Sequence, residues 1–264
     1  MKNILAEIIE IGKNTIIEET AIIRGISGKA KKVIIGDNVY IGHSVQIICD
    51  DFSIGDYSKI HHHTNIHGYK PCKIGHNAWI GQYSIIDSIG GTEIGNNCGI
   101  GAHSQLWSHI KFGDTLEGCR FYSEKTLKIG NDVWFVGHCI VSPIIAEDKS
   151  MALVGSVVTK DMKFNTIYAG CPAVAISDKI GPQFNEVSID EKLNKLKQYL
   201  RESGADCNKI VIVRHPSEFK DDGKSYFAVE TREYLKLGTE DEIKFMKYLL
   251  PEKAKFVPYS KKLT

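Results

Sequence analysis

The sequence lacks any run of about 18 apolar residues, the length a helix needs to cross a bilayer, so we expect no membrane span. It also lacks a charge imbalance, because 33 Lys and Arg residues against 32 Asp and Glu residues leave a net charge of +1. This balance does not indicate nucleic acid or an anionic membrane as a partner. Glu7 and Glu10 interrupt the apolar N-terminal stretch, which does not resemble a secretory signal, and we expect a cytoplasmic protein.

Paired cysteines are missing as well. The seven cysteines are scattered without a CxxC pair, and their number is odd. A zinc cluster needs closely spaced ligands and a disulfide framework needs an even set of partners, so neither is indicated and we expect no bound metal. The simplest interpretation is reduced thiols, several of them small buried residues.

What the sequence does contain is a repeat of six residues. An aliphatic residue, often followed by glycine, recurs at every sixth position in groups of three. The groups are Ile11/Ile17/Ile23, Ile35/Ile41/Ile47, Ile54/Ile60/Ile66, Ile74/Ile80/Ile86, Ile94/Ile100/Leu106 and Ile129/Phe135/Val141, with a less regular turn over about Ala146, Ala152 and Val158. Repetition of this kind indicates an array of stacked structural units.

A period of six fits neither an α-helix nor a simple hairpin sheet. On a helix with 3.6 residues per turn, every sixth residue would be spread around the surface. We interpret each hexad as a short flat strand followed by a corner, with the aliphatic side chain pointing inward. Three hexads make one triangular coil, and because a single coil cannot bury its own apolar side chains, coils must stack in parallel around one core. This predicts an all-β triangular prism of about seven coils.

The spacing between groups indicates where the prism is interrupted. Successive groups start 19, 20 and 20 residues apart from Ile35 to Ile94, but 35 residues separate Ile94 from Ile129. The residues beyond a coil of 18 always follow the third aliphatic residue of a group, so every excursion leaves the prism at one corner. The long excursion, 107–123, is polar and aromatic, and function concentrates in such loops. We expect it to lie near His67 and Asp87.

After residue 184 the repeat is lost and the composition changes. The expected elements are a helix opened by Ser188 and Glu191, strands at 209–213 and 225–230, and a second helix from Thr239 to Leu250. Residues 185–264 are therefore predicted to be a small α+β domain after a β-helix domain at 1–184. No motif in this second domain indicates a chemical role.

Residues 128–176 carry a more specific motif: KIGNDVWFVGHCIVSP, then VGSVVTKDM and YAGCPAVAI. Together with the repeat, this motif resembles the hexapeptide-repeat acyltransferases, most closely the sugar O- and N-acetyltransferases. The resemblance implies a left-handed parallel β-helix and transfer of an acyl group from acetyl-CoA, or a similar acyl-CoA, to a hydroxyl or an amine. Because members of the family are usually trimers with active sites between adjacent prisms, it also implies a homotrimer.

The same resemblance indicates His109 as the catalytic residue. In the sugar acetyltransferases a catalytic histidine lies in the inserted loop, about twenty residues before the Ile-Gly of the Trp-bearing coil. His109 lies 20 residues before Ile129, whereas His103 lies 26 before it and fits less well. The chemistry agrees, because an imidazole that titrates near neutral pH suits removal of a proton from a hydroxyl or an ammonium group. We expect His109 to be the general base.

Further residues are expected to bind the acceptor and the cofactor. Trp107 offers an aromatic face that suits a sugar ring, and the other expected acceptor contacts are His103, Asp87, Lys111 and Arg120. The expected cofactor contacts are Gly137, Gly155 and Ser156 for the pantetheine arm, Thr159 and Lys160 for the nucleotide end, and Gly170 and Pro172, which are similar to the family's exit loop.

Two other functions stay open. A metalloenzyme of the γ-carbonic-anhydrase kind uses the same prism with zinc held by three histidines across subunits. The stretch IHHHTNIHGYKPCKIGHNAWIGQYSIIDS superficially resembles that site, but Gln82 and Asp87 stand near the expected later histidines. A non-catalytic β-helix module for assembly is the other alternative. For the acyltransferase, the acceptor is expected to be a sugar or nucleotide-linked sugar, such as one used in polysaccharide biosynthesis.

Overall fold

The computed structural model describes residues 3–260, which form two compact units. The first unit runs to Phe184 and the second begins at Asn185. Each unit is described by itself below. No helix within residues 3–260 is long and apolar enough to cross a bilayer.

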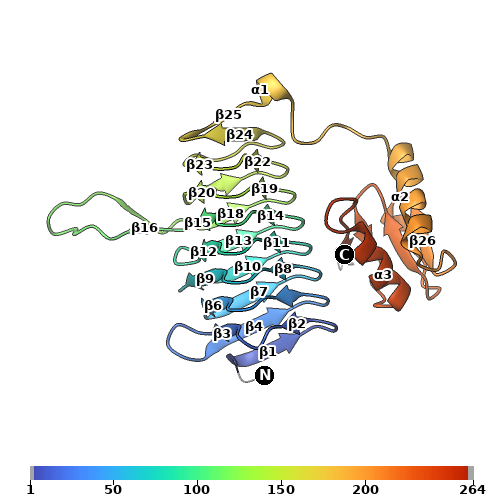
Figure 1. The fold of residues 1–264 in the computed structure, drawn as a ribbon, viewed down its shortest axis with the longest axis horizontal. Helices are drawn as coiled ribbons and strands as arrows, with labels where there is room; N and C mark the ends of the chain where they lie inside the picture. The colour runs from blue at the N-terminus through green and yellow to red at the C-terminus, as the bar shows by residue number, and fades with distance from the viewer. Residues whose placement is uncertain (1–2, 261–264) are drawn as a thin grey trace. The chain divides into compact units, whose positions relative to one another are not determined.

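The first unit is a left-handed parallel β-helix with three flat faces, which we call A, B and C (Figure 1). Face A contains β3 (Ile22–Arg24), β6 (Gln46–Cys49), β9 (Asn65–Gly68), β12 (Ile85–Asp87), β15 (Gln105–Leu106), β20 (Ile140–Val141) and β23 (Val157–Val158). Face B contains β4 (Ala30–Ile35), β7 (Asp51–Ile54), β10 (Cys72–Ile74), β13 (Thr92–Ile94), β18 (Leu127–Ile129) and β21 (Ile145–Ala146). The first strand, β1 (Ile4–Ile11), pairs with both β3 and β4.

Face C contains β2 (Ile16–Ile17), β5 (Tyr40–Ile41), β8 (Lys59–Ile60), β11 (Trp79–Ile80), β14 (Gly99–Ile100), β19 (Trp134–Phe135), β22 (Met151–Ala152), β24 (Ile167–Gly170) and β25 (Ala173–Ala175). All strand pairs within the three faces are parallel except the final β24–β25 hairpin, after which the short helix α1 (Ser177–Ile180) follows. Each coil therefore visits face B, then C, then A, and a B–C, a C–A and an A–B corner separate the faces.

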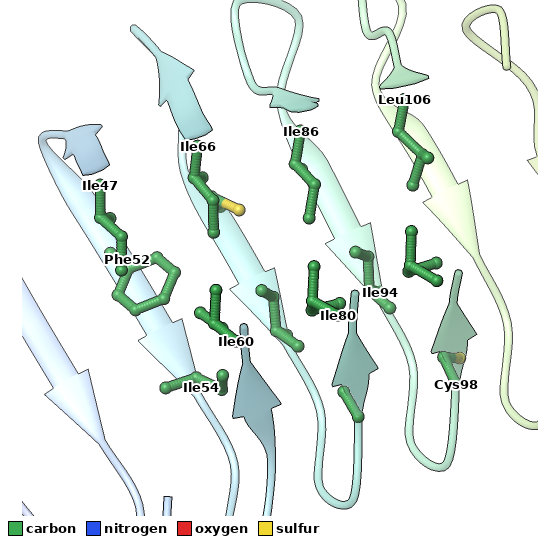
Figure 2. Packing of buried hydrophobic residues seen from close by; sticks show 14 of the residues in the cluster. Ile47, Phe52, Ile54, Ile60, Ile66, Ile80, Ile86, Ile94, Cys98 and Leu106 are labelled. Carbon is green, nitrogen blue, oxygen red and sulfur yellow. The ribbon is translucent and has the colours of Figure 1, made fainter. Parts of the chain in front are cut away.

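The predicted hexads fill the core. Strand pairing places each aliphatic residue beside its counterpart in the next coil, for example Ile60 beside Ile80 and Ile66 beside Ile86. Figure 2 shows these side chains stacked inside the prism. Ile11 and Ile17 are only partly buried, because they belong to the first coil and β2 pairs on one side alone. The prediction of a continuous aliphatic core is confirmed.

Four of the seven cysteines are also buried in this core, and all seven are free thiols: Cys49, Cys72, Cys98 and Cys139 are the buried ones. Burial raises the pKa of the Cys72 thiol well above its ordinary value and also raises the pKa of Cys49. Cys49 and Cys72 therefore stay protonated, and all four buried cysteines serve as small packing residues.

The excursions leave at one corner, as the spacing indicated. Each lies between a strand of face A and the next strand of face B, which is the A–B corner. The long loop between β15 and β18 contains a two-stranded antiparallel hairpin, β16 (Ile110–Lys111) and β17 (Tyr122–Ser123), which the sequence did not indicate. Figure 1 shows this loop extending away from the prism.

The B–C corner has a regular backbone conformation that explains its composition. Its residues have φ between about 51° and 65°, the left-handed region that asparagine and aspartate tolerate better than most residues. The positions are occupied mainly by such residues: Asn14, Asn38, Tyr57, Asn77, Asn97, Asp132, Lys149 and Asn165. Their side chains can bond to one another along the corner, since Asn77 Nδ2 donates to Asn97 Oδ1 at 2.9 Å.

The second unit has a four-stranded sheet in the order β26 (Ile210–Val213), β27 (Ser225–Ala228), β28 (Glu233–Tyr234) and β29 (Val257–Pro258). Its other elements are α2 (Ile189–Ser203), the 3₁₀ turn Pro216–Glu218 and α3 (Glu240–Leu249). The expected capping box of α2 is present, because Ser188 and Glu191 bond reciprocally, and Gly204 ends the helix in the left-handed conformation. The expected helices and strands of this segment are confirmed.

Removing side-chain volume from the core is expected to lower the denaturant concentration at which the prism unfolds. Ile60→Ala deletes a fully buried side chain in the middle of the array and should lower the free energy of unfolding by about 2–5 kcal/mol. Ile140→Ala, at a site that is 43% exposed on the outer surface, is the matched control and should cost less than about 1 kcal/mol. Chemical denaturation followed by circular dichroism measures both, and equal losses would contradict the assignment of inward and outward positions.

Candidate functional site

His109 lies at the A–B corner, at the base of the long loop, three residues after β15 ends. Its Nδ1 atom is 2.8 Å from Oδ2 of Asp87, the last residue of β12 in the preceding coil. The His109 side chain is 18% exposed and the Asp87 side chain only 4%. The structure therefore brings together two residues that the sequence placed near one corner but did not pair.

Asp87 is held in place by bonds from the loop that carries His109. Its Oδ2 atom accepts from the Ser108 amide at 2.9 Å and from the Ser108 hydroxyl at 2.6 Å. Its Oδ1 atom accepts from the Ile89 amide at 3.4 Å, and its backbone carbonyl accepts from the Thr92 hydroxyl at 2.6 Å. A carboxylate fixed on several sides fixes the imidazole bound to it, so the orientation of His109 is set before any ligand arrives.

The bond to Asp87 also determines what His109 can do. An ionised carboxylate only accepts hydrogen bonds, so the bonding network assigns the proton of neutral His109 to Nδ1. The other ring nitrogen, Nε2, then carries a lone pair and can accept a proton. When it does, the nearby negative charge of Asp87 stabilises the imidazolium that forms. The pair therefore has the arrangement of a general base and its orienting group.

Asp87 was expected to contact the acceptor, and its position argues for a different role. A carboxylate that is 4% exposed and surrounded by Ser108 and His109 has no free face for an acceptor. Ser108 itself was not singled out from the sequence, because nothing in a single serine distinguishes a hydroxyl that braces a carboxylate from one in solvent.

Three of the other expected acceptor residues lie on the same loop. The Trp107 ring lies edge-on to the His109 ring, with centroids 6.2 Å apart. Lys111 Nζ bonds Glu124 Oε1 at 2.6 Å, a contact that raises the pKa of Lys111 and keeps it charged. Lys70, from the A–B corner two coils below, reaches the other oxygen of Glu124 at 3.8 Å. Arg120 is exposed near the far end of the loop.

His103 was also expected to line the site, and the structure does not place it beside His109. It lies at the C–A corner with φ of 59°, at the opposite end of face A from the A–B corner. Its ring stacks on Tyr83 and His138 of the neighbouring coils, with centroids 5.1 and 4.9 Å away. Within one copy of the chain, His103 and His109 therefore belong to different edges of the prism.

The expected cofactor residues divide between the same two corners. Gly137 and Gly155 lie in adjacent coils at the C–A corner, and the Gly155 amide donates to the Gly137 carbonyl at 3.0 Å. Thr159 and Lys160 follow β23 and are exposed at the A–B corner. The Ser156 side chain is buried and its hydroxyl donates to the Leu153 carbonyl at 2.6 Å. Gly170 and Pro172 are exposed in the turn between β24 and β25.

The surface around Gly137 and Gly155 suits a long, thin ligand with apolar stretches. Both glycines have positive φ, at 149° and 72°. Gly137 is buried, whereas Gly155 is exposed and a side chain there would meet no atom within 4 Å. Exposed apolar side chains flank them: Trp134 is 45% exposed, Ile140 43% and Val154 66%. Bare backbone between apolar side chains can bind amide groups and methylene groups in turn, which is what a pantetheine arm offers.

The histidine run considered for zinc has other contacts. His61 lies against Trp79, with ring centroids 4.8 Å apart, and burial lowers its pKa. His62 and His63 both contact the Tyr83 ring, and His67 contacts Tyr69. In the part of the chain that the structure describes, no three His, Cys, Asp or Glu side chains gather as a metal-binding group.

Comparison with known proteins gives a similarity that is limited in extent. No protein-family model matches the chain. Galactoside O-acetyltransferase of Escherichia coli (strain K12) is 38% identical over 53 residues, which are 20% of this chain and 26% of that protein. The chain thus spans about a quarter of the length of this curated relative.

Three solved structures are similar in fold. AntD, an N-acyltransferase from Bacillus cereus in complex with dTDP and 3-hydroxybutyryl-CoA, is 17% identical with a TM-score of 0.47, covering 63% of this chain and 81% of that chain. The polySia-specific acetyltransferase NeuO is 20% identical with a TM-score of 0.47, covering 75% and 91%. A maltose O-acetyltransferase from Clostridium difficile 630 is 22% identical with a TM-score of 0.38, covering 60% and 69%.

The 53-residue match to galactoside O-acetyltransferase repeats the resemblance seen in the sequence motif. The solved structures, at 17–22% identity, are similar to this chain in fold alone.

The bracing of Asp87 can be tested without any substrate. Asp87→Ala removes the buried acceptor of the Ser108 amide and should speed hydrogen exchange at that amide by roughly 5–30-fold, the equivalent of about 1–2 kcal/mol. Asp114→Ala is the matched control, because Asp114 Oδ1 accepts from the Leu116 amide in the exposed part of the same loop. Exchange measured by NMR or mass spectrometry that leaves Ser108 unaffected would contradict the described network.

Proposed function

We propose that this chain is a CoA-dependent acyltransferase that transfers an acyl group, most simply acetyl, to a hydroxyl or amine of a sugar or a nucleotide-linked sugar. The single observation that carries this proposal is the His109–Asp87 pair, with 2.8 Å between Nδ1 and Oδ2. The similarity of a 53-residue segment to a galactoside O-acetyltransferase supports the same class of reaction.

In the proposed reaction His109 acts as the general base. Its Nε2 atom takes the proton of the acceptor hydroxyl or amine while the acceptor oxygen or nitrogen bonds to the carbonyl carbon of the thioester. Asp87 keeps Nδ1 as the protonated nitrogen and stabilises the imidazolium. The carbon–sulfur bond then breaks, and the imidazolium returns the proton to the leaving sulfur. The products are an ester or amide of the sugar and free CoA thiol.

The residues that would hold the acyl-CoA are those at the C–A corner and the last coils. Gly155 leaves bare, exposed backbone at this corner, and Trp134, Ile140 and Val154 are exposed apolar side chains of the same two coils, which suits the pantetheine arm. Lys160 is an exposed cation that would serve the phosphates at the nucleotide end, although it lies at the A–B corner. When bound, acyl-CoA supplies an activated acyl group on a good leaving group.

This arrangement calls for more than one copy of the chain. His109 lies at the A–B corner and Gly137 at the C–A corner, and these edges bound the same face of the prism. The chain crosses face A from His103 at the C–A corner to His109 at the A–B corner, a path of six steps that extends up to roughly 20 Å. We propose a homotrimer in which His109 of one copy faces the Gly137–Gly155 corner of the next, so that each site takes residues from two copies.

The loop supports this assembly because its tip is unusually apolar for a surface. Phe112 is 102% exposed, Leu116 92% and Phe121 74%. Exposed apolar side chains grouped on one projecting segment are typical of a protein–protein contact. A neighbouring copy that covers them would also bring the base of the loop, and His109, close to its own C–A corner.

Loss of the base is expected to abolish most of the activity. His109→Ala should lower kcat for thiol release from acetyl-CoA by roughly 10²–10⁴-fold with a panel of amino sugars and hydroxy sugars. Asp87→Asn should lower kcat by at least about tenfold, because the amide can no longer hold the Nδ1–H tautomer. His43→Ala, at an exposed histidine in an earlier coil, is the control and should behave like wild type.

Turnover at the wild-type rate in His109→Ala would remove His109 from the mechanism. If acetyl-CoA released no thiol with any acceptor and did not raise Tm, the proposed function would be rejected. Stoichiometric zinc in the purified protein would instead favour the carbonic-anhydrase alternative.

The proposed assembly has its own test. Wild-type protein is expected to sediment as a trimer, and the triple substitution Phe112→Ser, Leu116→Ser and Phe121→Ser should weaken the trimer by at least about tenfold in dissociation constant. Ile180→Ser, which changes an exposed apolar residue of α1, is the matched control. Sedimentation velocity decides the outcome, and a wild-type monomer would reject the shared site.

A further inference from the structure

A continuous row of aromatic rings follows the C–A corner over four consecutive coils. The rings of His63, Tyr83, His103 and His138 stack nearly parallel, with interplanar angles of 10–11° and centroid steps of 4.9, 5.1 and 4.9 Å. The row is therefore about 15 Å long. We call these four residues the ring ladder. All four are exposed to solvent.

The backbone does not explain why these residues are rings. Every member of the ring ladder has φ between 51° and 59°, the same left-handed conformation as the positions of the B–C corner. At the B–C corner that conformation is met mainly by asparagine, which tolerates it well. At the C–A corner four successive coils carry histidine or tyrosine instead. A demand other than backbone geometry must account for the difference between two corners of one prism.

The ring ladder also differs from the B–C corner in leaving its polar atoms free. Asn77 and Asn97 bond to each other, whereas the ring nitrogens and the Tyr83 hydroxyl make no hydrogen bond within residues 3–260. Because the rings cover one another's faces, their edges point outward. Each neutral imidazole offers one donor and one acceptor, and the phenol offers both, so the ladder presents hydrogen-bonding groups in steps of about 5 Å.

The ring ladder ends where the proposed cofactor surface begins. Above His138, the same corner position in the next coil is Gly155, which carries no ring and leaves open space. A ligand lying along the ladder therefore has one end beside Gly137 and Gly155. A molecule that reaches from His63 to His138 is extended over about 15 Å, and hydroxyl groups repeated along it would match both the donors and the acceptors of the ring edges.

We propose that the ring ladder binds an extended oligosaccharide acceptor, with the reacting unit at the His138 end and further sugar units along His103, Tyr83 and His63. This inference rests on the proposed acyltransferase function and names its acceptor as a chain rather than a single sugar. Hydroxyl groups of successive units bond the ring edges, and the stacking fixes the rings in advance, so little side-chain entropy is lost on binding.

The test compares acceptors of increasing length. Thiol release from acetyl-CoA is measured with maltooligosaccharides, chitooligosaccharides and oligosialic acids, each from monomer to hexamer. For the wild type, kcat/KM should rise at least about tenfold from monomer to hexamer in one series, the gain expected from one or two well-made hydrogen bonds. A kcat/KM that does not change with acceptor length in any of the three series would overturn the proposal.

Asparagine is the conformationally matched replacement, because it occupies the same φ at the B–C corner. In the double variant His63→Asn/Tyr83→Asn, the hexamer-to-monomer ratio of kcat/KM should fall to near one. Ser44→Asn, one coil below the ladder at φ of 56°, is the control and should keep the wild-type ratio. An unchanged ratio in the double variant would overturn the proposal. If the assembly of that variant also dissociated, the ladder would be a contact between copies instead.

Direct binding separates this proposal from the proposed function. Titration calorimetry without any CoA thioester should detect hexasaccharide binding to the wild type and a loss of at least about tenfold in affinity for His63→Asn/Tyr83→Asn. If the hexasaccharide binds but acetyl-CoA releases no thiol with any acceptor, the ring ladder remains a glycan site and the acyltransferase is rejected. If acetyl-CoA releases thiol but binding does not depend on acceptor length, the acyltransferase remains and the ladder proposal is rejected.

Discussion

Parallel pairing of each coil with the coils above and below is the interaction on which the rest of the prism depends. Strands of two to four residues have too few hydrogen bonds to persist alone, and the aliphatic side chain of each hexad has apolar neighbours only in adjacent coils. The pairing fixes the register of every strand. It therefore also fixes where each corner lies, and which corner side chains come to lie beside one another.

The candidate site follows from this constraint. Asp87 closes one coil and His109 opens the loop of the next, so their bond joins residues that are 22 positions apart in the chain but one coil apart in space. Ser108 strengthens the link by bonding the same carboxylate oxygen. The proposed base is thus supported by the paired coils of the prism, while the loop beyond it extends outward.

The sequence allowed the repeat and the corner of the excursions to be predicted, because a period of six and the extra residues after each third hexad can be read directly from the letters. The direction of the side chains at the corners could not be predicted from the sequence. His103 looked close to His109 by number, but its left-handed backbone turns its ring along the corner toward Tyr83. The bond of Asp87 to His109 depends on the path of the chain after Trp107, which no local pattern encodes. The hairpin of Lys111 and Tyr122 was missed for the same reason.

The loop joins the prism at Leu106 and Leu127, two buried residues whose strands are already paired with their own coils. Closing a longer or shorter segment between such fixed points changes the free energy slowly, by about 0.6 kcal/mol for each doubling of length. The stacked coils and the projecting loop are consequently separate parts of the chain, and the loop can change in length at little cost to folding. Evolution, or an engineer, can exchange the arm at this corner for another while the stacked coils that support it stay the same.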